Sequence, residues 1–168
     1  YKAISLTGWQ AGIHTNEENQ NAKIEYINSQ RIEKELQEGK IVVVAGFQGI
    51  DENDNITTLG RGGSDTTAIS VAAALNAKCC YIYSDVEGVF TADPRKLKNA
   101  VKLKELSYDE MLDISNEGAK VLHNRCVEIG KKFNIPILAK STFKDDKGNI
   151  IKKSRSKVDV KPLIKDDY

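Results

Sequence analysis

The sequence of 168 residues is short of several residue types, among them cysteine, proline, methionine and tryptophan. It has 3 cysteines, 3 prolines, 1 methionine and 1 tryptophan. Cys79, Cys80 and Cys126 are too few, and wrongly spaced, for a disulfide framework or a zinc site with Cys-X-X-Cys ligands. The composition therefore indicates a reducing compartment, and we expect the protein in the cytoplasm.

An excess of charge of either sign is also missing. The chain has 25 lysines and arginines against 24 aspartates and glutamates, a formal net charge of +1, which favours no general attraction to nucleic acid or anionic lipid. No apolar run approaches the roughly 20 residues that span a bilayer, and no charged-then-apolar leader opens the sequence. We expect neither nucleic acid nor a membrane as a partner. Any phosphate chemistry must therefore depend on residues at one local site.

Extended and helical patterns alternate along the chain. Strands are expected at residues 23–28, 41–45, 78–83 and 135–139, and helices at residues 29–38, 64–75, from Ser107 onward and at 118–133. Turn formers at 51–55 predict a hairpin tip. This alternation predicts an α/β fold, a three-layer αβα sandwich with a mostly parallel sheet.

Individual residues sharpen these expectations. Ser29 is placed to cap the first helix and Gly39 to end it, while Glu110 stands in capping-box position relative to Ser107. The β-branched run at 41–45 is typical of a strand covered on both faces. Residues 23–45 are thus predicted to form a strand-helix-strand unit.

The length fits one domain. We assign residues 1–143 to this domain, and residues 144–168 to a charged tail, a hairpin followed by a linker. The first residue is Tyr1, and it leads at once into patterned sequence. We therefore expect the chain to begin within a domain, and a sheet cut there would expose an edge that favours dimerisation or aggregation.

Residues 59–68 carry a glycine-rich turn just before a predicted helix. Glycines let the backbone approach a ligand, and the amino end of a helix attracts an anion. Arg61 adds a planar fork for a carboxylate or phosphate, and Asp65 can orient a cationic group. The structural alternative is a glycine turn with Ser64 as the N-cap, but the added Arg61 and Asp65 favour function. The spacing matches neither the P-loop nor the dinucleotide-binding pattern.

Residues 84–95 follow a predicted strand, where ligands of open α/β sheets bind. Here Asp85 could hold a ribose hydroxyl or a base edge, Phe90 could flank an adenine and Arg95 could face the phosphates. For Asp93 and Pro94 a turn is the favoured interpretation.

Lys120 falls in the first turn of the helix predicted at 118–133. A lysine there opposes the helix dipole, which hints at an anionic partner, although a solvated lysine is the commoner case. Metal-binding or catalytic roles are not assigned to His14, His123 or the cysteines, and the basic run at 152–157 is interpreted as solvated.

Taken together, four motifs resemble those of aspartokinases in the amino acid kinase superfamily. They are residues 5–12 (Ser-Leu-Thr-Gly-Trp-Gln-Ala-Gly), 60–68, 84–95 and 118–123, and the match runs in order through roughly residues 5–143. The first motif separates aspartokinases from glutamate, acetylglutamate and uridylate kinases. The resemblance implies part of an amino acid kinase (carbamate kinase-like) fold.

The resemblance also implies a reaction and its residues. ATP, bound with Mg²⁺, would transfer its γ-phosphoryl group to the side-chain carboxylate of L-aspartate, giving 4-phospho-L-aspartate for lysine, threonine and methionine biosynthesis. Substrate binding would fall to Arg61 and Ser64, and catalysis to Asp65 and Lys120. Nucleotide-binding residues would be Ser84, Asp85, Phe90, Arg95 and Lys120. No protein ligand for the metal can be assigned.

Several family features have no counterpart here. The Lys-Phe/Tyr-Gly-Gly motif and the aspartate-binding glutamate that precede the first motif are absent, as are regulatory ACT domains, and His123 is followed by Asn124 instead of the commoner proline. We therefore expect an enzyme whose missing N-terminal part is a partner of this chain, and an inactive fragment as it stands. The parent enzyme is expected to be a homo-oligomer. A non-catalytic nucleotide-binding or assembly module, and a kinase for another acid such as acetylglutamate, are the alternatives.

Overall fold

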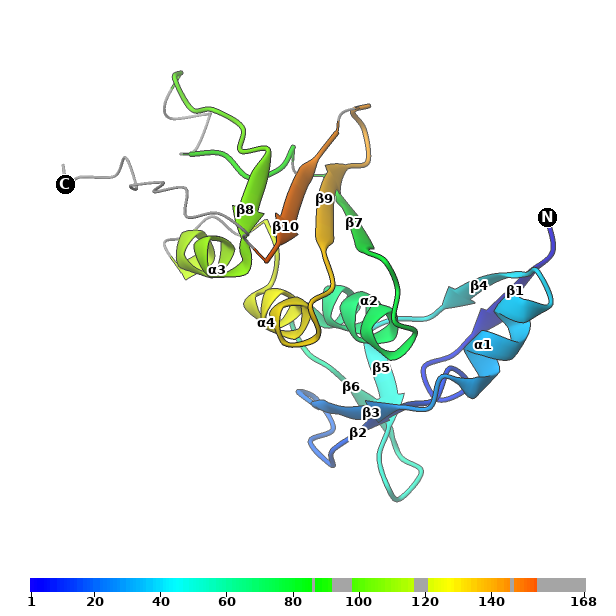
Figure 1. Cartoon of the computed structure of the whole chain (residues 1–168). Helices are drawn as coiled ribbons and strands as arrows, with labels where there is room; N and C mark the ends of the chain where they lie inside the picture. Colours follow the sequence, from blue (N-terminus) through cyan, green and yellow to red (C-terminus); the bar gives the residue numbers. More distant parts are fainter. Residues whose placement is uncertain (86, 92–97, 117–120, 146, 154–168) are drawn as a thin grey trace. The chain divides into compact units, whose positions relative to one another are not determined.

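The computed structural model describes residues 1–85, 87–91, 98–116, 121–145 and 147–153 (Figure 1). The chain divides into two compact units, residues 1–80 and 81–168, and each unit is described by itself. Arg95 and Lys120 lie outside the described residues.

Unit 1 contains a pair of parallel strands, β1 (Ala3–Leu6) and β4 (Ile41–Val44). Helix α1 (Gln30–Gln37) packs on β4 and ends where predicted, at Gly39, whose φ of 74° is left-handed. The amides of Gly39 and Lys40 donate to carbonyls of the last helical turn, a Schellman ending. The buried core of this region is formed by Leu6, Ala11, Ile13 and Ile32.

A second sheet of unit 1 has the order β3-β2-β5-β6. Its strands are β2 (Ile13–Thr15), β3 (Ile24–Ile27), β5 (Gln48–Ile50) and β6 (Ile56–Thr58). The antiparallel β5–β6 pair confirms the hairpin predicted around residues 51–55. Strand β2 pairs in parallel with β5 and antiparallel with β3.

Three details of unit 1 differ from the sequence-based expectations. Ser29 occupies the N-cap position of α1, but its hydroxyl bonds to the Glu33 carboxylate instead of capping the helix. Strand β4 is covered on one face only, because Ile41 and Val43 are each 52% exposed. The predicted strand-helix-strand order is present as β3, α1 and β4, but β3 and β4 belong to different sheets and do not pair.

Unit 2 has one sheet in the order β7-β9-β10-β8 (Figure 1). Its strands are β7 (Cys80–Ser84), β8 (Glu105–Ser107), β9 (Ile137–Ser141) and β10 (Asn149–Lys152). Strand β10 lies between its neighbours, antiparallel to β9 and parallel to β8. The division at residue 143 stays a prediction, although β10 already belongs to this sheet.

Two helices of unit 2 pack on each other, α3 (Tyr108–Asn116) and α4 (Asn124–Phe133). The capping box of α3 is confirmed: the Glu110 amide donates to Ser107 Oγ at 3.1 Å, and the Ser107 amide donates to Glu110 Oε2 at 2.6 Å. The helix predicted from residue 118 begins later, at Asn124. His123 is its extended N-cap, with Nδ1 accepting from the Arg125 amide, so the helix cannot continue back through His123.

The protein is therefore a mixed α/β structure with parallel strand pairs and helices, as the alternating sequence pattern predicted. Antiparallel pairs also occur, at β2–β3, β5–β6 and β9–β10. Their strands are 3 to 5 residues long, and an apolar pattern of that length does not show whether a strand pairs in parallel or antiparallel.

The capping box gives a first testable prediction. Ser107→Ala removes the acceptor of the Glu110 amide, which costs about 1 kcal/mol and lowers the melting temperature by roughly 2–4 °C. Thermal unfolding by circular dichroism measures the change. Ser107→Thr keeps a hydroxyl and is expected to melt close to wild type; equal melting of the alanine variant and wild type would contradict the role of the cap.

Candidate functional site

The turn before helix α2 (Gly63–Ala74) requires glycine at several positions. Gly60 and Gly62 have φ values of 72° and 73°, in the left-handed region. At Gly63 a Cβ would lie 2.7 Å from a ring carbon of Phe47. The turn is thus built tightly against the chain segment after β4.

Ser64 is not the N-cap of α2. Gly62 holds that position, and no side chain caps the helix. The structural alternative from the sequence, a glycine turn capped by Ser64, is therefore wrong, because the helix begins one residue earlier than predicted. Ser64 is exposed, in the first turn of the helix.

Ser64 lines a groove of about 320 Å³ between β4 and α2. The groove lies where the carboxyl end of β4 meets the amino end of α2: a Cβ added at Gly46 would meet Ser64 Cα at 3.5 Å. Carboxyl ends of strands and amino ends of helices are the usual places for anionic ligands in α/β proteins. The groove is lined by Val42, Val44, Gly46, Ser64, Thr67, Ala68 and Val71.

Thr67 fixes one end of this groove. Its hydroxyl donates to the Gly63 carbonyl at 2.8 Å and accepts from the Phe47 amide at 3.0 Å. Phe47 has a φ of 74°, which is uncommon for a residue with a side chain. The sequence pattern did not identify Gly46, Phe47 or Thr67 as residues of a site. The signal that could have found this place is a glycine directly after a predicted buried strand.

The other predicted residues of this turn lie beside Ser64. Arg61 is exposed in the turn, and Asp65 is half-buried in the first helical turn. The structure therefore brings Arg61, Ser64 and Asp65 together at the amino end of α2. An arginine at the amino end of a helix can hold an anion, and the Asp65 carboxylate can orient a cation.

A second group of predicted residues belongs to unit 2. Ser84 ends β7, and its carbonyl accepts from the Thr142 amide at 2.8 Å. Asp85 is exposed, and Phe90 is half-buried and forms an antiparallel bridge with Lys102. The described part of this segment is thus extended and held against the following chain.

The placement of Lys120 in the first turn of a helix stays a prediction, because Lys120 lies outside the described residues and the described helix begins at Asn124. Any role for Lys120 or Arg95 now depends on the resemblance alone.

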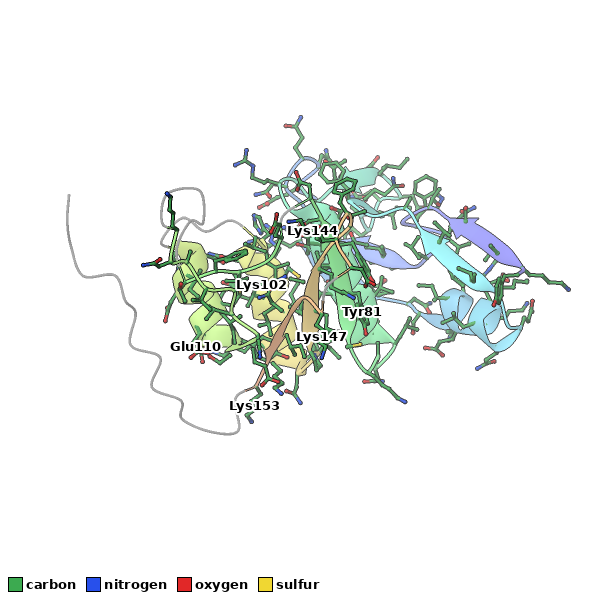
Figure 2. The ribbon with its side chains drawn as sticks, turned by 90° about the horizontal axis from the view of Figure 1, so that it is seen from above. Tyr81, Lys102, Glu110, Lys144, Lys147 and Lys153 are labelled. Carbon is green, nitrogen blue, oxygen red and sulfur yellow. The ribbon has the colours of Figure 1, made fainter. Side chains whose placement is uncertain are left out.

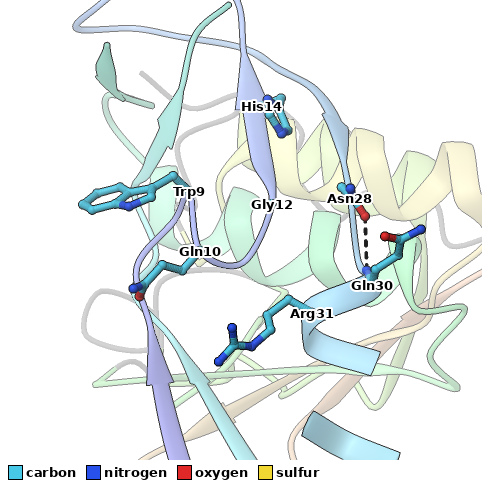
Figure 3. Close-up of a pocket in the computed structure, with 7 residues that line it drawn as sticks. All are labelled: Trp9, Gln10, Gly12, His14, Asn28, Gln30 and Arg31. Carbon is cyan, nitrogen blue, oxygen red and sulfur yellow. Dashed lines mark hydrogen bonds between the residues drawn. The ribbon is translucent and has the colours of Figure 1, made fainter. Parts of the chain in front are cut away.

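Another hollow of unit 1, shown in Figure 3, is not lined by Arg61, Ser64 or Asp65. It has a volume of about 240 Å³. The backbone amide of Gln30 donates to Asn28 Oδ1 at 3.3 Å. Arg31 Nε donates to Oε1 of the buried Glu35 at 2.8 Å. Trp9 is 38% exposed here. The hollow is lined by Trp9, Gln10, Gly12, His14, Asn28, Gln30 and Arg31.

Metal and membrane features were sought in the part of the chain that the structure describes. Within it, no group of three or more histidine, cysteine or acidic side chains is arranged to hold a metal ion. Its helices also lack the combined length and apolar character needed to cross a bilayer.

The comparison with known proteins agrees with the resemblance. The model of the amino acid kinase family matches residues 1–141, and the chain belongs to this family. Its sequence is 56% identical to an aspartokinase of Geobacillus stearothermophilus over 156 residues, 93% of this chain and 38% of the relative. Aspartokinase 2 of Bacillus subtilis is 53% identical, with the same coverage.

Solved structures show the same relationship. Aspartokinase III of E. coli, crystallised with aspartate and ADP, matches with a TM-score of 0.82 and 29% identity over 92% of this chain and 36% of that chain. The aspartate kinase of Synechocystis matches with a TM-score of 0.76 and 43% identity, over 93% of this chain and 25% of that one. The fold is that of the amino acid kinases, in part: the chain spans under two fifths of the length of these relatives.

The Thr67 hydroxyl gives a prediction for the groove. Thr67→Val keeps the side-chain shape but leaves the Phe47 amide without its acceptor, which costs about 1 kcal/mol or more in unfolding free energy. Thr66→Val is the matched control, since the Thr66 hydroxyl makes one bond within the helix, to the Gly62 carbonyl at 2.9 Å. Urea denaturation should rank Thr67→Val below Thr66→Val in stability; the reverse order would contradict the bridging role.

Cysteine reactivity gives another prediction. Burial, with smaller effects from Cys79 and Asp65, raises the pKa of the Cys80 thiol to about 11, so at pH 8 it stays protonated and unreactive. Cys79 is half-buried and its neighbour Cys80 is 7% exposed. Iodoacetamide at pH 8, followed by peptide mass spectrometry, should modify Cys79 before Cys80. Faster modification of Cys80 would mean that this thiol is activated.

Proposed function

We propose that this chain is the ATP-binding part of an aspartokinase catalytic domain. The parent enzyme transfers the γ-phosphoryl group of ATP to the side-chain carboxylate of L-aspartate, and 4-phospho-L-aspartate then enters lysine, threonine and methionine biosynthesis. The observation that carries the proposal is the amino end of α2, where Ser64 lines a groove, Arg61 and Asp65 stand close to it in sequence, and no side chain caps the helix. Support comes from the aspartokinase similarity and from the E. coli relative, which was crystallised with aspartate and ADP.

Phosphoryl transfer depends mainly on positioning and on neutralising charge, so few residues need covalent chemistry. In this proposal Arg61 grips the α-carboxylate of aspartate and Ser64 contacts the same substrate. Asp65 orients the lysines around the transferring phosphoryl group. The amino end of α2 adds a favourable field for the anionic substrate.

The nucleotide is assigned to the second group of residues. Ser84, Asp85, Phe90 and Arg95 hold ATP, and Lys120 stabilises charge on the phosphoryl group during transfer. Magnesium arrives as part of the ATP complex. The enzyme acts in the cytoplasm and assembles from identical subunits, and this chain alone is inactive because lysine and glutamate residues of the active site lie in the part of the relatives that it does not cover.

The decisive experiment compares the chain alone with the chain supplemented by the N-terminal segment of its own gene. Isothermal titration measures binding of ATP and ADP, and a coupled assay measures turnover with aspartate. We expect nucleotide binding by the chain and aspartate turnover only after complementation. Binding without turnover in the complemented enzyme would favour a non-catalytic nucleotide-binding module.

Arg61 tests the substrate. In the complemented enzyme, Arg61→Ala should lower kcat/KM for aspartate about a hundredfold, the scale of a lost charge-assisted pair. Arg61→Lys, which keeps the charge but not the fork, should fall between the alanine variant and wild type. Efficient turnover of acetylglutamate by the wild-type enzyme, with aspartate ignored, would show that the substrate assignment is wrong.

A further inference from the structure

One buried side chain of strand β10 holds the segment that carries Phe90. Asn149 is the first residue of β10 and is 0% exposed. Its Oδ1 accepts from the Val89 amide at 3.0 Å, and its Nδ2 donates to the Val89 carbonyl at 3.2 Å. Nδ2 also donates to the Leu103 carbonyl. The carboxamide thus uses its oxygen and both of its hydrogens.

Exchange of both bonds with a single residue is how two residues pair in an antiparallel ladder. The Asn149 side chain therefore takes the place of a neighbouring strand for Val89, which is itself fully buried. The orientation of the amide is fixed by its partners, because a flipped group would set hydrogens against the Val89 amide and oxygen against the Val89 carbonyl.

The neighbouring glycine fits this arrangement. Gly88 has a φ of 122°, and a Cβ there would overlap the carboxamide oxygen of Asn149. A residue with a side chain at position 88 would displace the amide. The close approach of Asn149 to the backbone thus depends on glycine at this place in the segment.

Other contacts tie the same segment to the β9–β10 hairpin and to the chain before β8. The Leu103 amide donates to the Val89 carbonyl at 3.0 Å, and the Thr91 amide donates to the Val101 carbonyl at 3.0 Å. Lys144, labelled in Figure 2, forms an ion pair with Glu87. Both partners of that ion pair are more than half exposed, so it contributes little. The buried amide of Asn149 is the stronger tie, since its bonds are shielded from water.

We propose that Asn149 is a positioning residue for the nucleotide. It fixes the backbone of residues 88–90, and through it the direction of the Phe90 ring, without touching the nucleotide itself. This inference rests on the proposed function, which places Phe90 beside the adenine. A segment held in its binding conformation loses less conformational freedom when the ligand arrives, so releasing it should weaken binding.

The test combines hydrogen exchange with nucleotide binding on the full chain. Asn149→Ala removes all three bonds; Asn149→Asp keeps the size and the acceptor but removes both donated bonds. Ile151→Val is the matched control, because Ile151 is also 0% exposed on β10 and its change removes one methylene without altering any hydrogen bond. Circular dichroism establishes that each variant is folded, and Asn149→Asp serves if Asn149→Ala is not.

We expect the amides of Val89, Thr91 and Leu103 to lose protection together in Asn149→Ala, and the ADP dissociation constant to rise about tenfold or more. Ile151→Val should keep both properties near wild type. Loss of protection at Val89 alone, or unchanged ADP affinity in a folded Asn149 variant of a chain that binds ADP, would overturn the inference. If the wild-type chain binds no ADP while the exchange pattern is as expected, the proposed function fails, and the nucleotide role of Asn149 with it.

Discussion

The bridge made by the Thr67 hydroxyl is the interaction on which the candidate site depends. It joins the chain leaving β4, at Phe47, to the first turn of α2, at Gly63. Because Gly63 carries no side chain, Phe47 can lie against it, and one hydroxyl can then reach both segments. The groove beside Ser64 and the exposed turn with Arg61 follow from this junction. A polar site at a strand end is thus held by one short side chain and by glycines that admit it.

The segment assigned to the nucleotide is built on a comparable principle. A side-chain amide from β10 replaces a strand partner for Val89, and the Thr142 amide holds the carbonyl of Ser84. In both units, the residues proposed to meet the substrates stand at or beside the end of a helix or strand, and buried polar side chains hold the adjacent backbone. Such groups must be satisfied when buried, so they specify one conformation more strongly than apolar contacts of similar size.

Charge has a local role in this protein. The formal net charge is only +1, so attraction of an anionic substrate over long distances is weak. The amino end of α2 and the arginine beside it supply a positive field over a short range. Elsewhere charges pair with one another: Lys40 and Arg31 bond to the buried Glu35, and the bond from Lys40 holds the pKa of that carboxyl below its usual value. The pair with Lys40 joins α1 to the chain just after its end, and none of these side chains lines the groove beside Ser64.

The sequence by itself determined the family, the α/β class and most of the elements, because apolar periodicity, the Gly39 stop and the Ser107–Glu110 capping box are properties of neighbouring residues. It also picked out the turn at residues 60–68. Only the tertiary structure decided that Gly62 and not Ser64 caps α2, that β4 is covered on one face, and that α4 begins at Asn124. The roles of Thr67 and Asn149 were equally hidden. Their partners, Phe47 and Val89, lie 20 and 60 residues away in sequence, and contacts across such distances are set by packing, which no local pattern records.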